Sequence, residues 1–291
     1  MSDRRPVRPS RYRPVVDTTI VYEGIDFGEG PRWRDGALWF SDFYQHVVRR
    51  WQPDGPVTVE ATVPGQPSGL GWLPDGRLLV VSMTDRTVLR REDDGTLVEH
   101  ADLGSIATHH CNDMVVDGEG RAYVGNFGFD MHGGGEMQTA TLALVHPDGR
   151  AEVAATDLMF PNGSVITPDG STLIVGETMA SRYTAWDVGS EGALANRRVW
   201  AEAPGRYPDG CTMDPDGGIW FADPGGNECV RVVEGGEITD QIEASQTCFA
   251  CTLGGPALDT LYVLTAPGSG PDEVRGKGLG RLEAVRVGVA S

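Results

Sequence analysis

Short apolar runs separated by turn-forming residues occur along the whole chain, and six stretches share one pattern of apolar and polar positions. Each stretch starts with small or polar residues, continues as an apolar run, turns at Gly, Asp or Pro, and ends in a second apolar run. Runs this short, bounded by turn residues, predict paired β-strands rather than helices. The six stretches are 29–43, 67–83, 111–127, 161–178, 208–223 and 248–266.

Weaker strand pairs with their own turns lie between these stretches, so the repeating unit is about four strands and recurs every 38 to 50 residues. Such a unit is typical of a propeller blade, and the sequence predicts an all-β fold, a six-bladed β-propeller. The repeat runs through the middle of the chain, which leaves no linker for two domains. A β-sandwich would not need six similar units.

The ends of the chain predict how the ring closes. Residues 16–24 precede the first full unit and residues 280–289 follow the last, and either segment could complete the sixth blade. We expect residues 15–291 to form a single propeller domain. Residues 1–14 contain arginines but no apolar run of the kind found in secretory signals, and we expect a flexible tail there.

Composition narrows the class of protein. The net charge of −18 argues against a nucleic-acid partner, because phosphate binding needs a basic face, and it would concentrate a divalent cation. No apolar run approaches the length of a membrane span. Five cysteines without a signal peptide fit reduced thiols, so we expect a cytoplasmic protein with no membrane partner. The oligomeric state is left open.

Polar residues recur at the start of the strand that would line the central channel. Counting seven residues back from the turn gives Ser68, Asn112, Asn162 and Asp209, and the shorter first unit gives Glu29. Equivalent positions of different blades meet at the channel of a propeller. We therefore expect Glu29, Asn112, Asn162 and Asp209 to converge near one mouth.

Two carboxylates and two carboxamides supply only oxygen ligands, which favour Ca²⁺, Mg²⁺ or Mn²⁺ over metals that prefer thiolates. Converging carboxylates with no Lys or Arg at the equivalent positions also require a neutralising cation. The simpler interpretation is that each residue caps a turn through its backbone. Their recurrence at one position of the repeat favours the metal site.

The motifs at these positions resemble those of the gluconolactonase / senescence marker protein (regucalcin) family, the SMP-30/LRE-type lactonases. They are EGP at 29–31, ND at 112–113, FPNG at 160–163 and PDG at 208–210, in that order. The resemblance implies a six-bladed propeller that hydrolyses a small lactone or a related ester. It also implies one catalytic divalent metal ion, with Ca²⁺ as the first choice and Mg²⁺, Mn²⁺ or Zn²⁺ as alternatives.

The resemblance implies Glu29, Asn162 and Asp209 as metal ligands, with Asn112 beside the metal or in contact with substrate. Sugar-lactonase relatives typically carry Arg two residues before this Asn, where this chain has His110. A substrate-binding acidic residue of such relatives is matched by Asp130. Losing a guanidinium fork changes what the site can recognise, so an ordinary aldonolactone is not the expected substrate.

The Gly-rich segment 128–140 follows the third unit and leaves its strand on the side of the predicted site. It is either a lid or a mobile connection between strands. Its residues Phe129 and Met131 favour a substrate less polar than a bare sugar lactone.

The expected mechanism has a metal ion polarising the carbonyl group while a general base activates water. Asp209 is the first choice for this base and His110 the second, because a histidine titrates near neutral pH. Two alternatives stay open. One is a non-catalytic propeller with a structural Ca²⁺ site, and the other is a phosphotriesterase-type hydrolase on the same scaffold.

Overall fold

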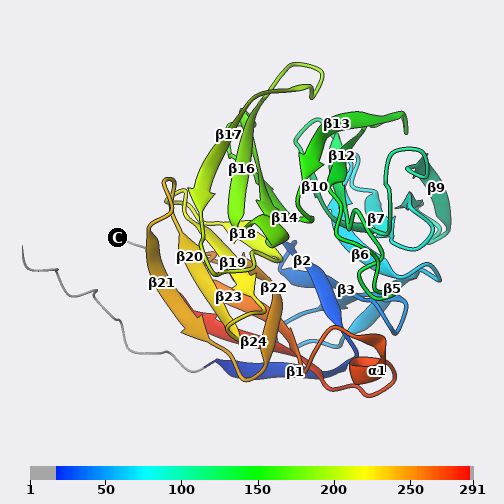
Figure 1. Ribbon diagram of the computed structural model, residues 1–291. Coiled ribbons are helices and arrows are strands. Elements are labelled where there is room, and N and C mark those ends of the chain that lie inside the picture. The colour runs from blue at the N-terminus through cyan, green and yellow to red at the C-terminus, as the bar shows by residue number, and fades with distance from the viewer. Residues whose placement is uncertain (1–17, 289–291) are drawn as a thin grey trace, which may run out of the picture.

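The computed structural model describes residues 18–288, which form six antiparallel four-stranded sheets arranged around a central axis (Figure 1). The predicted all-β, six-bladed β-propeller is confirmed. The predicted tail, residues 1–14, lies outside the described residues. Across residues 18–288, no helix combines the length and the apolar character needed to cross a bilayer.

Five blades are each built from four consecutive strands, with the first strand at the channel and the fourth at the rim. The first blade is β2 (Gly28–Arg34), β3 (Ala37–Asp42), β4 (Val47–Trp51) and β5 (Thr58–Thr62). The second is β6 (Pro67–Trp72), β7 (Leu78–Ser82), β8 (Thr87–Arg91) and β9 (Leu97–Asp102). The third is β10 (Cys111–Val116), β11 (Ala122–Asn126), β12 (Ala140–Val145) and β13 (Ala151–Leu158). The fourth is β14 (Pro161–Ile166), β15 (Thr172–Glu177), β16 (Arg182–Val188) and β17 (Leu194–Glu202). The fifth is β18 (Cys211–Met213), β19 (Ile219–Asp223), β20 (Glu228–Val232) and β21 (Ile238–Glu243).

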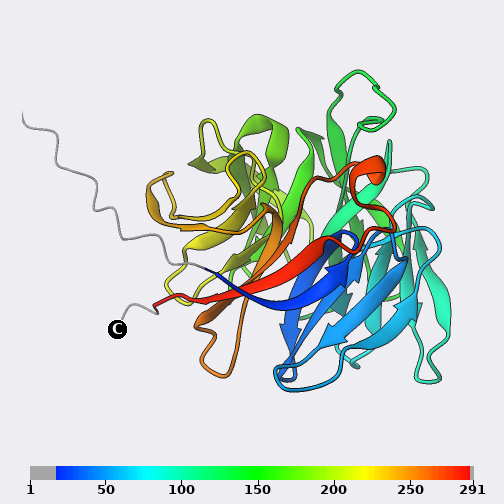
Figure 2. The ribbon, with the colours of Figure 1, turned by 90° about the horizontal axis from the view of Figure 1, so that it is seen from below.

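The sixth blade joins both ends of the described chain. It contains β22 (Thr247–Gly254), β23 (Thr260–Ala266) and β24 (Gly280–Arg286), with β1 (Thr19–Ile25) as its outermost strand. β1 runs beside β24 in Figure 2, and Tyr22 pairs with Leu282. The two segments predicted as alternatives for closing the ring therefore both enter the same blade. Between strands lie the 3-10 helix η1 (Thr178–Ala180) and the short helix α1 (Pro271–Val274).

The buried carboxylate of Glu283, on β24, ties this blade together. It accepts hydrogen bonds from the hydroxyl groups of Ser245, Thr265 and Thr18 and from the backbone N–H of Ser245. Burial alone would raise the pKa of Glu283, but the bonds from Ser245, Thr18 and Thr265 outweigh it and hold this pKa below its usual value. The ionised form is therefore the one that the closed blade stabilises.

We expect Glu283→Gln to destabilise the protein by about 2 kcal/mol at pH 7, because hydrogen bonds to a charged acceptor are weakened. A lowered folded-state pKa stabilises the fold above the unfolded-state pKa, near 4.3, and this contribution is lost as the pH falls through the folded-state value. The difference in melting temperature between wild type and variant should therefore shrink at about pH 3. The control is Glu23→Gln, which removes one partner of the exposed ion pair with Arg281. It should lower the free energy of unfolding by less than about 1 kcal/mol at either pH.

The fifth blade contains two Asp-Gly pairs, Asp209-Gly210 and Asp216-Gly217, and each requires glycine for a different structural reason. Gly217 has a φ of 80° in the turn between β18 and β19, a backbone conformation that glycine adopts without strain. Gly210 instead lies where the inner strands of neighbouring blades approach closely, and a Cβ atom added there would be 2.4 Å from that of Ala250. Glycine after Asp209 therefore lets adjacent blades pack close together at the channel.

Candidate functional site

The inner strands of several blades depart from regular pairing at the predicted site positions. The register shifts between Glu29 and Arg32 in β2, and the equivalent shifts in β10 and β14 span Asn112 and Asn162. A β-bulge of this kind bends the strand and redirects side chains that a regular strand would point toward a sheet face. The bulges thus place polar side chains at the channel.

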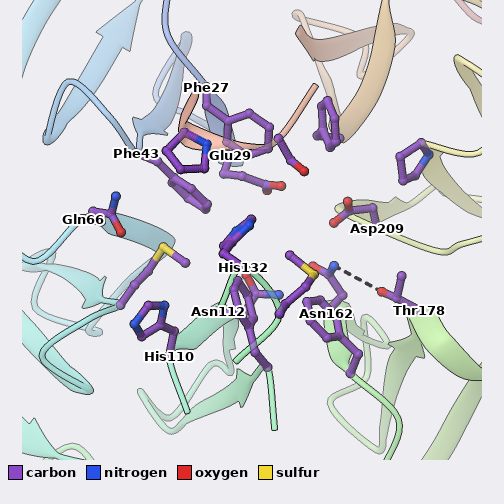
Figure 3. Close-up of a pocket in the computed structure, with 18 of the residues that line it drawn as sticks. Phe27, Glu29, Phe43, Gln66, His110, Asn112, His132, Asn162, Thr178 and Asp209 are labelled. Atoms are coloured by element: carbon purple, nitrogen blue, oxygen red, sulfur yellow. Dashed lines mark hydrogen bonds between the residues drawn. The ribbon is translucent and has the colours of Figure 1, made fainter. Parts of the chain in front are cut away.

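The four predicted site residues line one cavity of about 550 Å³ at the mouth of the channel. Figure 3 shows Glu29 and Asp209 on one side of it and Asn112 and Asn162 on the other, with their polar ends directed toward the space between them. All four are buried. Asp209 precedes β18, and its backbone N–H donates to the carbonyl of Ala222 at 3.0 Å. The predicted convergence of these residues is therefore present in the structure.

The amide of Asn162 is held in one orientation. The hydroxyl of Thr178 donates to the carbonyl of Pro208 at 2.7 Å, so its oxygen accepts the N–H of Asn162 at 3.2 Å (Figure 3). With its nitrogen assigned in this way, the amide carbonyl oxygen of Asn162 is free for another partner. Thr178 was not predicted, although it follows β15 directly in the sequence.

The two carboxylates of this cavity lie in an unfavourable electrostatic environment. Burial raises the pKa of Glu29 well above its usual value, and the nearby charges of Asp209 and Asp113 raise it further. Burial also raises the pKa of Asp209, with Asp113 adding to the effect and a hydrogen bond from Asn162 opposing it. Carboxylates placed in this way are stabilised in the ionised form by a bound cation.

The donor set fits a hard divalent cation. The Oδ1 atom of Asp209 is buried and has no hydrogen-bond partner, and the carboxylate of Glu29 accepts the N–H of Gly30 at 3.0 Å. Within residues 18–288, no group of three or more His, Cys, Asp or Glu side chains is arranged to hold a metal. A cation here would therefore depend on the carboxamide oxygens of Asn112 and Asn162 and on water, which suits a metal that prefers oxygen.

A buried ion pair lies beside the site. Asp113 follows Asn112 in β10, and its carboxylate accepts a hydrogen bond from the guanidinium of Arg32 at 2.8 Å. Asp113 is almost fully buried, and Arg32 is the cation that lowers the pKa of Glu29. This pair was not predicted from the sequence, although Asp113 belongs to the ND motif and Arg32 directly follows the EGP motif.

The two adjacent histidines have different surroundings. His110 lies just before β10 and lines the cavity, close to Asn112 in Figure 3. Burial lowers the pKa of His110, and the neighbouring ring of His109, 4.3 Å away between centroids, lowers it further. The neutral imidazole is then the form present at pH 7 and is able to accept a proton. The Nε2 atom of His109 instead lies 3.9 Å from the Oδ1 atom of Asp130.

Asp130 belongs to the 128–140 loop and has mainly local contacts. Its Oδ1 accepts the N–H of Gly133 at 2.7 Å, and it is absent from the residues that line the cavity. The same loop brings Met131 and His132 into the cavity lining, and His132 projects over its centre in Figure 3. The substrate contact predicted for Asp130 stays a prediction, whereas His132 is a lining residue that sequence reasoning missed.

Ten of the residues that line the cavity come from two repeated positions of the blade. The first position is two residues before the site position, and the second directly follows the second strand. The first position supplies Phe27, Gln66, His110, Phe160 and Tyr207. The second supplies Phe43, Met83, Phe127, Thr178 and Pro224. The repeat alignment would have revealed both positions, but their apolar residues resemble those of an ordinary blade core.

The fold and the cavity define the class: a six-bladed propeller with oxygen-donor side chains at the mouth of its central channel. The chain belongs to the SMP-30/gluconolactonase/LRE-like family, because the sequence profile of the SMP-30/Gluconolactonase/LRE-like region matches residues 27–267. It is 30% identical over 282 residues to a pentonolactonase of Haloferax volcanii, which covers 91% of this chain and 92% of that relative. The predicted family is therefore confirmed.

Two solved structures share the fold. A luciferin-regenerating enzyme superposes with a TM-score of 0.79 at 20% identity, covering 94% of this chain and 95% of that one. A gluconolactonase from Xanthomonas campestris has a TM-score of 0.74 at 23% identity, with 98% and 99% of the chains covered. At these identities the likeness shows the architecture, and the chemistry has to be argued from the cavity.

Proposed function

We propose that this protein is a divalent-metal-dependent lactonase that opens the ring of a lactone, or cleaves a related ester, in the central cavity. Glu29, Asn162 and Asp209 would hold the metal, with Ca²⁺ as the first choice, and Asn112 would lie beside it. A cation bound there would polarise the scissile carbonyl and stabilise the oxyanion that forms on attack. The membership of the family and the lactonase names of its relatives support this reaction class.

The chain's own residues have separate tasks in this mechanism. Asp209 would bind the metal through Oδ1, the buried oxygen that has no partner, and would take the proton of the attacking water at its other carboxylate oxygen. His110, neutral because its pKa is lowered, is the second candidate for this proton. Asn112 and His110 contact the substrate from the third blade. Thr178 fixes the amide of Asn162 and thereby the direction of its carbonyl oxygen.

One observation carries the proposal. Two buried carboxylates share a cavity large enough for a small ligand, and one of their oxygens is buried without a hydrogen-bond partner. A buried charged group in this condition destabilises a fold unless a ligand or a cation compensates it. A cation at the base of an open cavity, with water able to approach, is the arrangement of a catalytic metal site.

The test is proton release from a panel of lactones by chelator-treated protein, before and after the addition of Ca²⁺, Mg²⁺, Mn²⁺ or Zn²⁺. We expect turnover only with metal, and a rise in melting temperature on adding the active metal, because binding to the folded state stabilises it. A rise in melting temperature without hydrolysis of any lactone would indicate a structural ion instead. Metal-independent hydrolysis would contradict the proposed mechanism.

A further inference from the structure

The wall of the cavity is fixed in place by buried carboxylates at the ends of the second strands. Asp42 accepts the backbone N–H of Phe27 at 3.2 Å. In the fourth blade, Glu177 accepts the N–H of Met159, the residue before Phe160, at 2.8 Å. Each carboxylate thus anchors the loop that presents a phenylalanine to the cavity. A wall anchored in this way is formed before a ligand arrives.

The phenylalanines form two groups on opposite sides of the channel. Phe27, between the first and sixth blades, has its ring centroid 5.1 Å from that of Phe43 and 4.7 Å from that of Phe249. In the third and fourth blades, Phe127 and Phe160 stack at 4.7 Å with an interplanar angle of 21°. These blades lie across the ring from the first and sixth, so the cavity lies between two aromatic surfaces.

The polar side chains of the cavity form its base and are interspersed with aromatic rings on its wall. The proposed cation would occupy the oxygen atoms of Glu29, Asn162 and Asp209 at the base. On the wall, five phenylalanines of one apolar cluster alternate with polar side chains, which include Gln66, Thr84, His110, His132, Tyr207 and Arg275. The guanidinium of Arg275 lies over the ring of Tyr44, 5.1 Å from its centroid. Sugar hydroxyls placed against the phenylalanine rings would be buried without partners, which weakens binding, whereas an apolar substituent would cover the rings favourably.

We infer that the cavity selects lactones that carry a flat, apolar substituent, such as an aryl-substituted γ-lactone, over sugar lactones. The inference rests on the proposed lactone hydrolysis and specifies its substrate class. The ring carbonyl lies toward Asp209, and the substituent lies between the two phenylalanine groups. Met131, half-buried against the same apolar cluster, covers the substituent from the 128–140 loop.

The test compares γ-phenyl-γ-butyrolactone, unsubstituted γ-butyrolactone and D-glucono-δ-lactone with the metal-loaded protein. We expect kcat/KM for the phenyl lactone to exceed that for the sugar lactone about 100-fold, the discrimination that an apolar pocket shows against an added hydroxyl group. Calorimetric binding of the phenyl lactone and the sugar lactone to metal-free protein gives a second reading that needs no turnover. A higher kcat/KM for the sugar lactone, or tighter binding of it to the metal-free protein, would overturn the inference.

Met131→Ser and Met137→Ser form a matched pair on one loop, because Met137 is 57% exposed and is absent from the cavity lining. Met131→Ser should lower the ratio of kcat/KM for phenyl lactone to that for γ-butyrolactone about 10-fold, and Met137→Ser should leave it unchanged. An equal effect of both variants would contradict the placement of the substituent. If the protein hydrolyses sugar lactones but not the phenyl lactone, the substrate inference is wrong and the proposed lactonase activity stands. If it binds the phenyl lactone but hydrolyses no lactone, the proposed lactonase activity is wrong and the apolar selectivity of the cavity stands.

Discussion

Replacing Asp209 with asparagine is expected to lower kcat for lactone hydrolysis about 1,000-fold or more, because the change removes both a metal ligand and the proposed base. The metal-free protein should not lose stability. Burial and the charge of Asp113 raise the pKa of Asp209, so its removal relieves an unfavourable group. We therefore expect an unchanged or higher melting temperature without metal and a smaller rise on adding Ca²⁺.

These readouts separate the two roles of Asp209. Turnover is measured at saturating metal, and metal binding is followed separately by the change in melting temperature. If the variant binds metal normally and retains most of its turnover, Asp209 is not the base, and His110→Gln becomes the informative variant. Asp216→Asn serves as the comparison, because it removes a carboxylate that is exposed in the turn between β18 and β19 and does not line the cavity.

Replacing Arg32 with methionine is expected to destabilise the protein by about 3–5 kcal/mol, because Asp113 is left as a buried charge without its cation. The corresponding fall in melting temperature is roughly 10 °C for a chain of this size. The second variant, with Asp113→Leu added to Arg32→Met, should recover most of this loss. Thermal unfolding by calorimetry measures all three proteins.

Arg150→Met is the control for the Arg32 substitution, because its ion pair with Asp148 is exposed on both sides. It should change the free energy of unfolding by less than about 1 kcal/mol. An equally small effect of Arg32→Met would mean that Asp113 finds another partner or takes up a proton. No recovery in the double variant would show that Arg32 acts mainly through packing.

The repeat made the architecture predictable from the sequence. Glu29, Asn162 and Asp209 could be brought together from their positions in the repeat alone, because a propeller places equivalent positions of its blades at one channel. The aromatic wall could not be inferred in the same way. Phe43 and Phe127 directly follow a buried strand, and such residues are indistinguishable by pattern from those that pack between blades.

The contacts between blades could not be predicted from the pattern of polar and apolar residues either. Arg32 and Asp113 are 81 residues apart and meet where the inner strands β2 and β10 are bulged. Bulges depend on the pairing of two strands, and a single strand's alternation of polar and apolar residues does not reveal them. The role of Gly210 was likewise hidden, since close approach to Ala250 is a property of neighbouring blades.

The pairing of β1 with β24 has a consequence for synthesis in the cell. β1 leaves the ribosome before the other described strands, yet its partner is made more than 250 residues later, as the pairing of Tyr22 with Leu282 shows. A contact of such sequence separation forms late, because the intervening chain has to be ordered first. A nascent chain that stalls before β24 therefore exposes an unpaired edge on β23, which makes it a target for chaperones or for aggregation.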